Sequence, residues 1–304
     1  MSDLPSTADL EEITGAAAPA AAEVTLGECL QSDAPVELAS LPSEARLALA
    51  AAVARAGFRR IGLTSLRDPA LHPAFADAEL LLRGLNRAPG LACQVACPDL
   101  MAVRRALAAQ DGGWGPEEVA LPVAATDAAS QAAFGEDRAA RWTRLADMAA
   151  LARGRFVLGG VITAAFADEA DPAGVLADAE RLAELGISRI TIADDEGRAT
   201  PARVRDLIGW LHGGLPTATF IARFGDRRGT AIANTLAAVE AGLDEADVAL
   251  GGAGGLCCAE DLAAALAAMG LDTGLDPALL RQAGLAAEQA LGRRLHSRVL
   301  RQEA

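Results

Sequence analysis

Residues 188–223 read SRITIADDEGRATPARVRDLIGWLHGGLPTATFIAR, and this stretch decides the fold. A β-rich run at 188–193 comes first, and a second one at 217–223 comes last. Between them, four apolar residues recur at i, i+3, i+4 and i+7, which places them on one stripe of a helix. These residues are Val204, Leu207, Ile208 and Leu211. The stretch therefore predicts a strand–helix–strand unit.

The same alternation continues outward in both directions. The other β-rich runs lie at 23–26, 60–64, 91–97, 117–123, 155–163 and 246–250. Eight such strand–helix units within about 250 residues predict an α/β fold, the (β/α)8 TIM barrel. Residues 276–302 are predicted as additional C-terminal helix.

A doubly wound open sheet is the alternative fold. That fold usually carries a glycine-rich phosphate turn after its first strand, whereas residues 27–31 here read GECLQ. Four glycines instead follow the eighth predicted strand, at positions 251, 252, 254 and 255. In barrels this is a usual place for a phosphate-binding loop. Gly254 and Gly255 are therefore candidate ligand-binding residues, and the barrel is favoured.

Composition excludes several classes of protein. The chain has 304 residues, with 27 basic against 41 acidic side chains and a net charge of −14. Nucleic-acid binding needs a basic surface, so we expect no nucleic-acid partner. The sequence contains no lysine, which excludes a Schiff-base aldolase, a pyridoxal phosphate aldimine and a Walker-A lysine.

Residues 1–22 are predicted to form a flexible N-terminal arm, and residues 23–304 the barrel domain with its C-terminal helical extension. The N-terminus has no signal-peptide pattern and no apolar run is long enough to span a membrane, so we expect a cytoplasmic protein.

The five cysteines are an odd number and suit reduced thiols. Cys93 and Cys97 are predicted to pack in the core. Cys257 and Cys258 are either buried at a helix start or reactive at the barrel mouth.

Two segments resemble the hydroxymethylglutaryl-CoA lyase family. Segment 188–201 resembles that family's strand followed by Gly-Asp-Thr, a glycine, and a Thr-Pro pair that opens a helix. Segment 226–242, with Asp226 and the run GTAIANTL from Gly229, resembles Asp-x-x-Gly-x-Ala-x-Ala-Asn-Thr-Leu. With further similarities in EV at 23–24, LQ at 30–31, TS at 64–65 and EDL at 260–262, the resemblance spans residues 23–290 in order.

The resemblance implies a metal-dependent (β/α)8 lyase that cleaves its substrate into acetyl-CoA and acetoacetate. Its metal site uses an aspartate after strand one, a His-x-His pair on strand seven and an asparagine after strand eight. In this sequence the Arg-Asp pair of strand one falls on Gly27 and Glu28, and a strand-two glutamate falls on Gly62. The two histidines fall on Arg223 and Gly225. The family's cysteine and asparagine fall on a shortened segment at 254–258.

This substitution changes the expected electrostatics. A guanidinium cannot ligate a metal and repels one, so we predict no metal site and no cofactor. Glu28, Asp194 and Asp226 are expected near the barrel mouth, where carboxylates without a counter-charge would have raised pKa values. Arg223 would replace the ion by a salt bridge with Glu28 or Asp194, unless it extends into solvent. These four residues are the candidates for a residual catalytic site.

Two functions are consistent with these substitutions. The first is a non-catalytic or repurposed relative of the lyases that binds a small acid, an acyl-CoA or a protein partner. The second is an active, metal-independent carbon–carbon lyase that uses Glu28, Asp194, Arg223 and Asp226. Arg227 and Arg228 are candidates for binding a carboxylate or the phosphates of CoA, or are a solvated pair at a helix start. We expect a homodimer or an assembly with a related lyase subunit, and no membrane partner.

Overall fold

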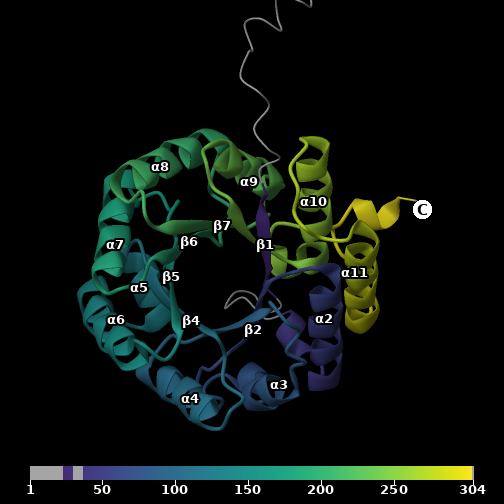
Figure 1. Ribbon diagram of the computed structural model, residues 1–304. Coiled ribbons are helices and arrows are strands. Elements are labelled where there is room, and N and C mark those ends of the chain that lie inside the picture. The colour runs from purple at the N-terminus through teal and green to yellow at the C-terminus, as the bar shows by residue number, and fades with distance from the viewer. Residues whose placement is uncertain (1–22, 30–36, 303–304) are drawn as a thin grey trace, which may run out of the picture.

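The computed structural model describes residues 23–29 and 37–302. Eight parallel strands close into a barrel in chain order, β1 to β8, so the predicted (β/α)8 barrel is confirmed and the open sheet is wrong (Figure 1). The strands are β1 (Thr25–Glu28), β2 (Arg60–Ser65), β3 (Ala92–Ala96), β4 (Glu118–Ala124), β5 (Val157–Thr163), β6 (Arg189–Asp194), β7 (Thr219–Phe224) and β8 (Glu245–Val248). The predicted arm, residues 1–22, lies outside the described residues.

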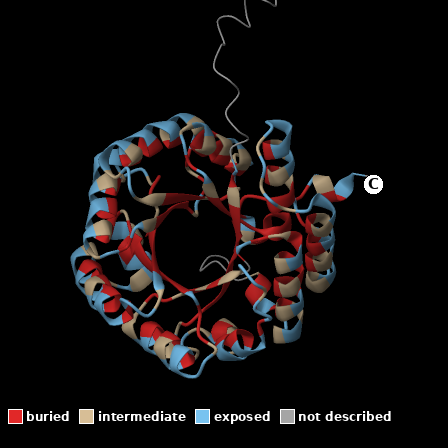
Figure 2. Ribbon diagram, viewed as in Figure 1, coloured by how far each residue is buried: buried red, intermediate tan, exposed pale blue. Residues whose placement is uncertain are grey.

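Helices surround the barrel, and each strand is followed in the chain by one of them (Figure 1). They are α2 (Ser43–Ala56), α3 (Ala78–Gly84), α4 (Leu100–Asp111), α6 (Arg138–Ala152), α7 (Pro172–Glu184), α8 (Pro201–Gly214), α9 (Ala231–Glu240) and α10 (Ala259–Ala268). An extra helix, α5 (Asp127–Phe134), lies between β4 and α6. The apolar stripe predicted in the deciding stretch is buried on α8, as Figure 2 shows for the inner faces of the outer helices.

Side-chain caps fix where several of these helices begin. The Thr200 hydroxyl accepts a hydrogen bond from the backbone N of Arg203, and Pro201 occupies the first position of α8. A proline is favourable there because its missing N–H would have no partner inside the helix. The Thr-Pro pair within the deciding stretch is therefore a local signal for the start of α8.

The C-terminal helix is shorter than predicted. Helix α11 spans Pro277–Leu291 and packs beside α2 and α10 (Figure 1). It ends because Gly292 has a positive φ of 67°, a conformation that stops a helix and favours glycine. A short 3₁₀ turn at Val299–Arg301 follows. The prediction of continuous helix over 276–302 was therefore wrong beyond Leu291.

The amino end of the barrel interior holds a network of charged side chains instead of an apolar layer. Arg60 Nη2 lies 2.5 Å from Asp247 Oδ1, and both residues are buried. Arg189 forms two hydrogen bonds with Glu245, of 3.0 and 2.7 Å. Gly27 makes room for this network, since a Cβ there would lie 2.4 Å from Arg60 Nη2.

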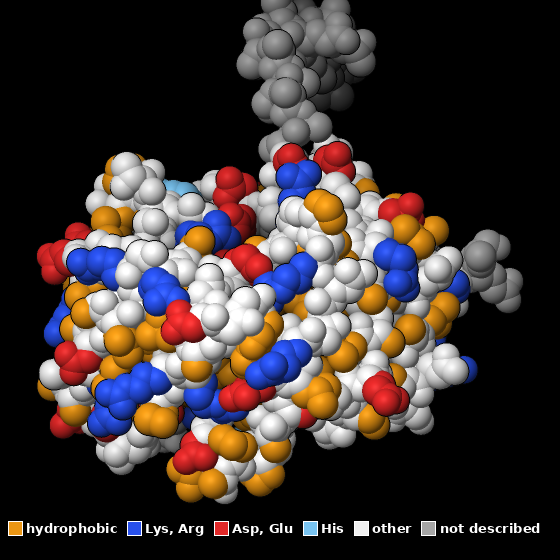
Figure 3. All heavy atoms as spheres, turned by 60° about the horizontal axis from the view of Figure 1, so that its bottom comes forward, with side chains coloured by type: hydrophobic (Ala, Val, Ile, Leu, Met, Phe, Trp, Pro, Cys, Tyr) orange, Lys and Arg blue, Asp and Glu red, His pale blue; other side chains and the backbone are white. Residues whose placement is uncertain are grey.

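No helix in the described part of the chain combines the length and apolar character needed to cross a bilayer. The face shown in Figure 3 carries basic and acidic side chains intermingled, with small hydrophobic groups between them. On that face the basic residues do not gather into one patch, which agrees with the excess of acidic residues in the sequence.

Candidate functional site

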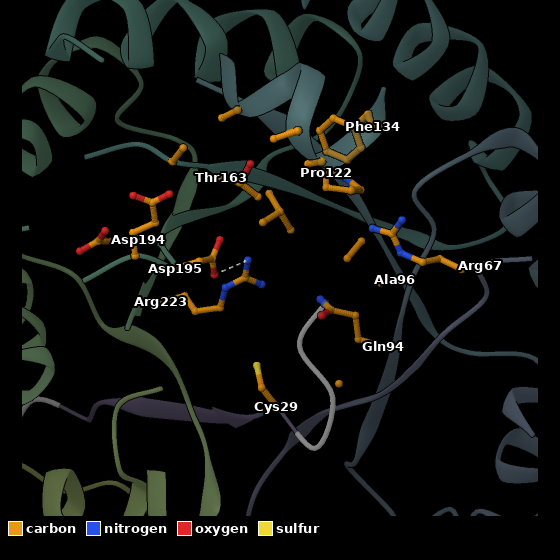
Figure 4. Close-up of a pocket in the computed structure, with 18 of the residues that line it drawn as sticks. Cys29, Arg67, Gln94, Ala96, Pro122, Phe134, Thr163, Asp194, Asp195 and Arg223 are labelled. Carbon is orange, nitrogen blue, oxygen red and sulfur yellow. Dashed lines mark ion pairs between the residues drawn. The ribbon is translucent and has the colours of Figure 1, made fainter. Parts of the chain in front are cut away.

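A cavity of about 500 Å³ lies at the carboxyl ends of the strands (Figure 4). Strand residues such as Thr64, Gln94 and Arg223 line it, because inward and outward side chains alternate along each strand. Helix α5 contributes an apolar wall of three alanines and Phe134. The cavity therefore combines a polar floor with an apolar side, which is the usual composition of a small-molecule site.

Arg223 reaches into this cavity from β7. Its side chain is 13% exposed, and its Nη2 lies 3.3 Å from Oδ1 of Asp195, the ion pair drawn in Figure 4. We predicted a salt bridge at this position, with Glu28 or Asp194 as the partner. The ion pair exists, but the predicted partners were wrong. Asp195 follows the end of β6 and is a carboxylate that pairs with Arg223.

Asp194 lines the same cavity but has another role. Its two carboxylate oxygens accept hydrogen bonds from the backbone N of Arg198, at 2.9 Å, and of Ala199, at 2.7 Å. Burial raises the pKa of Asp194, and these two hydrogen bonds partly oppose that effect. Asp194 therefore holds the turn that leads from β6 to α8, and Asp195 is left to pair with the arginine.

Glu28 does not line the cavity, which corrects the prediction that it faces the barrel mouth. The neighbouring Gly27 points inward, toward Arg60 and Asp247, so Glu28 points outward by the alternation of the strand. Its Oε1 accepts a hydrogen bond of 3.0 Å from the backbone N of Leu250. Burial raises the pKa of Glu28 well above its ordinary value, and the negative charge of Glu260 raises it further.

Asp226 also lies outside the cavity lining. Its Oδ1 accepts a hydrogen bond of 2.9 Å from the backbone N of Ala231, so it caps the start of α9. Arg227 and Arg228 follow it and are exposed, and neither lines the cavity. The prediction that Asp226 belongs to a catalytic cluster with Asp194 and Arg223 was therefore wrong. The two arginines fit the alternative of a solvated pair before a helix.

The glycine loop after β8 is not an open phosphate site. Two of its backbone N–H groups already donate to carboxylates of this chain, namely Gly251 to Glu260 at 2.7 Å and Gly254 to Glu37 at 2.9 Å. The carbonyl of Gly255 accepts from the backbone N of Asp226. A nest of N–H groups binds an anion only when those groups are free. Gly254 and Gly255 do not line the cavity, and their contact with a ligand stays a prediction.

The four cysteines that we expected to pack in the core or at a helix start are buried. Cys93 and Cys97 are fully buried, and Cys257 and Cys258 are buried as well, so the second pair is packed at the start of α10. Burial raises the pKa of Cys257 to about 12, which makes its thiolate scarce at neutral pH. Cys29 is different, because it lines the cavity, although burial raises its pKa too.

Several lining residues were missed in the sequence. Gln94 lies one position from Cys93 on β3, and alternation turns it to the opposite side, into the cavity. Thr64, Arg67 and His72 come from the end of β2 and the loop after it. Alternation alone identifies Gln94 once Cys93 is assigned to the core. Nothing in the local sequence predicted that α5 would cover the mouth.

The residues at the mouth do not fit the divalent ion that the resemblance implies. Arg223 and Gly225 stand where two imidazoles are expected, and a guanidinium is not a metal ligand. A Cβ on Gly225 would lie 2.9 Å from the carbonyl oxygens of Asp194 and Asp195, so there is no room for a second imidazole. Among residues 23–29 and 37–302, no three His, Cys, Asp or Glu side chains are placed to hold a metal.

The closed barrel and its polar-floored cavity define a (β/α)8 protein with a ligand site at the carboxyl ends of its strands. More narrowly, the chain belongs to the HMGL-like family, whose model matches residues 35–285. The mitochondrial hydroxymethylglutaryl-CoA lyase of Bos taurus is 28% identical over 274 residues, which cover 85% of this chain and 82% of the relative. The human enzyme is 27% identical over 261 residues, covering 81% and 79%.

Solved structures agree with this family membership. The HMG-CoA lyase of Bacillus subtilis superposes with a TM-score of 0.84 at 25% identity, covering 92% of this chain and 97% of that one. The HMG-CoA lyase of Acinetobacter baumannii, solved with coenzyme A and 3-methylmalate, gives a TM-score of 0.83 at 24% identity. That pair covers 92% of this chain and 94% of the other, and shows a shared fold.

Proposed function

We propose that this chain is a lyase-like protein whose metal site and catalytic residues are substituted, and that it binds a small organic acid or the acyl part of an acyl-CoA. The observation that carries the proposal is the position of Arg223. Its guanidinium lies in the cavity, where the resemblance places a dication. The positive charge is thus kept while the ability to act as a Lewis acid is lost.

The chemistry of the cavity supports binding of a carboxylate. An arginine forms two parallel, charge-assisted hydrogen bonds with a carboxylate, and these strengthen when water is excluded. The apolar wall of α5, with Phe134 at its end, suits the carbon chain of such an acid. The related lyase from Acinetobacter baumannii was solved with coenzyme A and an organic acid, which is consistent with ligands of this class.

The alternative is a metal-independent lyase built on Glu28, Asp194, Asp226 and Arg223. Of these four residues, only Asp194 and Arg223 line the cavity. The carboxylates of Asp194 and Asp226 are also hydrogen-bonded to backbone N–H groups. This arrangement favours binding over cleavage, and cleavage becomes one outcome of the test.

The test separates turnover from binding. Purified protein is incubated with hydroxymethylglutaryl-CoA, with Mn²⁺ or with EDTA, and acetoacetate is measured. We expect no acetoacetate in either case. Turnover that Mn²⁺ stimulates would overturn the proposal, and turnover that EDTA leaves unchanged would establish the metal-independent lyase.

Binding is measured on the same samples by calorimetry with short organic acids and acyl-CoA thioesters. We expect Arg223→Ala to weaken binding at least tenfold, about the value of one charge-assisted hydrogen bond. Arg205→Ala is the matched control, because Arg205 is an exposed arginine on α8 that pairs with Glu240 and does not line the cavity. Equal affinities of both variants would contradict the role of Arg223.

Two further parts of the proposal are independent of the ligand. We propose that the protein acts in the cytoplasm, and that it forms a homodimer or pairs with a related lyase subunit. Light scattering after size exclusion measures the mass of the isolated protein, and copurification from its source identifies a partner subunit. A monomer that copurifies with no lyase subunit would contradict the second part.

A further inference from the structure

The side-chain amide of Gln94, in the floor of the cavity, is held in one orientation by a hydrogen bond. Gln94 Nε2 donates a hydrogen bond of 2.6 Å to Oε1 of Glu118, which is the first residue of β4. A carboxylate only accepts hydrogen bonds, so the amide nitrogen must face Glu118. The amide oxygen of Gln94 is then the atom left for the cavity that Gln94 lines (Figure 4).

Glu118 belongs to the charged network at the amino end of the barrel. Its Oε1 lies 3.9 Å from Arg189 Nε, and its side chain is 5% exposed. Arg60 belongs to the same network through Asp247. A turned-over amide would place Gln94 Oε1 against Glu118 Oε1, where two acceptor oxygens repel each other, so this hydrogen bond fixes the amide.

The surroundings of Gln94 leave little freedom for another arrangement. A Cβ on Gly159 would lie 2.8 Å from Glu118 Oε1 and 3.6 Å from Gln94 Nε2, so β5 packs directly against this pair. On the other side, Gly62 of β2 is in register with Gln94 and also lines the cavity. Two glycines thus neighbour this pair: Gly159 makes room for Glu118, and Gly62 lies beside Gln94 on the adjacent strand.

A second polar group in the same floor lacks a partner. Thr64 lines the cavity from β2, and its hydroxyl oxygen is buried without a hydrogen-bond partner among the described residues. A buried hydroxyl normally has such a partner, and an unpaired one costs free energy. Rotation about its χ1 angle would let Thr64 bond to a ligand group bound beside Gln94.

We infer that Gln94 selects ligands that carry a hydrogen-bond donor, most simply a hydroxyl group, on the chain of the acid whose carboxylate Arg223 binds. In this arrangement the ligand hydroxyl donates to Gln94 Oε1. Glu118 is a positioning residue, because it acts only through the orientation of Gln94. The inference rests on the proposed function, since it assumes that the cavity binds an organic acid at Arg223.

The test uses three probes that differ at one group: 3-hydroxybutanoate, butanoate and 3-oxobutanoate, with the 4-substituted pentanoates as a second series. The ketone can only accept hydrogen bonds, so an amide oxygen repels it. For the wild-type protein we expect the hydroxy acid to bind about 3- to 10-fold more tightly than the unsubstituted acid in at least one series, and the oxo acid most weakly. Equal affinities in both series would overturn the inference.

Two variants separate the roles of the two residues. Gln94→Leu is expected to abolish the preference for the hydroxyl, and Gln289→Leu, at an exposed position on α11, is its control. Glu118→Gln lets the Gln94 amide turn over and donate, so the oxo acid is expected to gain affinity relative to the hydroxy acid. Glu184→Gln, at an exposed position on α7, is the second control. A purely structural role for Glu118 would weaken all probes equally, and that result would contradict its positioning role.

The outcomes also distinguish this inference from the proposed function. If the acids bind and Arg223→Ala weakens their binding, but the hydroxy, unsubstituted and oxo acids have equal affinities, only the role of Gln94 is overturned. If none of the acids binds the wild-type protein, the proposed function fails and this inference fails with it. Thermal melting of each variant confirms that Gln94→Leu and Glu118→Gln remain folded before affinities are compared.

Discussion

Asp195 Oδ1 lies 3.3 Å from Nη2 of Arg223, so this arginine of the cavity pairs with a residue that directly follows β6. The pair is only partly exposed, with 13% of the arginine side chain and 25% of the aspartate side chain accessible. An acid that binds Arg223 therefore has to share the guanidinium with Asp195. This competition lowers the affinity of Arg223 for anions.

The first prediction concerns that competition. Asp195→Asn removes the negative charge but keeps the shape, so we expect butanoate to bind about 3- to 10-fold more tightly, from about 1 kcal/mol of relieved repulsion at partial exposure. Calorimetry at low and high salt measures this, and the gain should shrink at high salt. Asp206→Asn, at an exposed position on α8, is the control. Weaker binding by Asp195→Asn would mean that Asp195 orients Arg223 for the ligand.

The second prediction concerns the space around Gly225. A Cβ at this position would lie 2.9 Å from two backbone carbonyl oxygens, and backbone atoms cannot move aside as a flexible side chain can. We expect Gly225→Ala to lower the free energy of unfolding by about 1–3 kcal/mol. Gly209→Ala on α8, where a Cβ meets nothing within 4 Å, should raise it by about 0.5–1 kcal/mol. Urea denaturation measures both.

The same clash predicts the behaviour of a variant designed to recreate the His-x-His pair. We expect Arg223→His with Gly225→His to lose stability and to gain no tight site for Mn²⁺ or Zn²⁺, because the second imidazole has no room. Calorimetric titration with each metal checks this. Tight, stoichiometric binding by a folded double variant would contradict the steric argument.

The sequence predicted the barrel because each strand and helix carries its own local pattern. It also placed Arg223 correctly at the mouth, since Arg223 ends a β-rich run of clear length. It failed for Glu28, because that placement came from the resemblance to the family's aspartate after strand one and not from the alternation of side chains along β1. In the observed register Gly27 faces inward and Glu28 does not.

The glycine loop shows a different limit of prediction from sequence. Its glycines were recognised, but two of the carboxylates that accept from its N–H groups are distant in the chain. Glu28 is 222 residues from Leu250, and Glu37 is 217 residues from Gly254. Local composition contains no information about such contacts. The choice between Asp194 and Asp195 as the partner of Arg223 failed similarly, because it depends on which carboxylate the backbone of residues 198–199 engages.

A fourth prediction follows from the two buried carboxyl groups behind the glycine loop. Burial raises the pKa of Glu28 and of Glu260 above their ordinary value of 4.5. The folded protein then holds more protons than the unfolded chain, so its stability falls as pH rises from about 4.5 to the raised pKa values. We expect Glu28→Gln to remove part of this loss. Its free energy of unfolding at pH 8 should exceed that of the wild type by on the order of 1 kcal/mol, because one pKa unit corresponds to about 1.4 kcal/mol.

Urea denaturation at pH 5 and at pH 8 measures this effect. The wild-type protein should lose stability between the two values, and Glu28→Gln should lose less. Glu184→Gln, an exposed substitution, should follow the wild type. A wild-type stability that rises across this interval would show that other groups dominate, and would contradict the assignment to Glu28.

The last prediction concerns the buried pair of Arg60 and Asp247, on which the barrel interior is built. Asp247→Asn leaves the Arg60 guanidinium buried with Glu245, whose Oε2 is 4.0 Å away, as its nearest remaining counter-charge. We expect the free energy of unfolding to fall by about 3 kcal/mol, since removing one member of a buried ion pair is far more costly than replacing both. Arg60→Met combined with Asp247→Leu should lose less than the sum of the single variants, because no uncompensated charge remains. Denaturation of all four proteins completes this double-mutant cycle, and additive losses would show that the two side chains do not depend on each other.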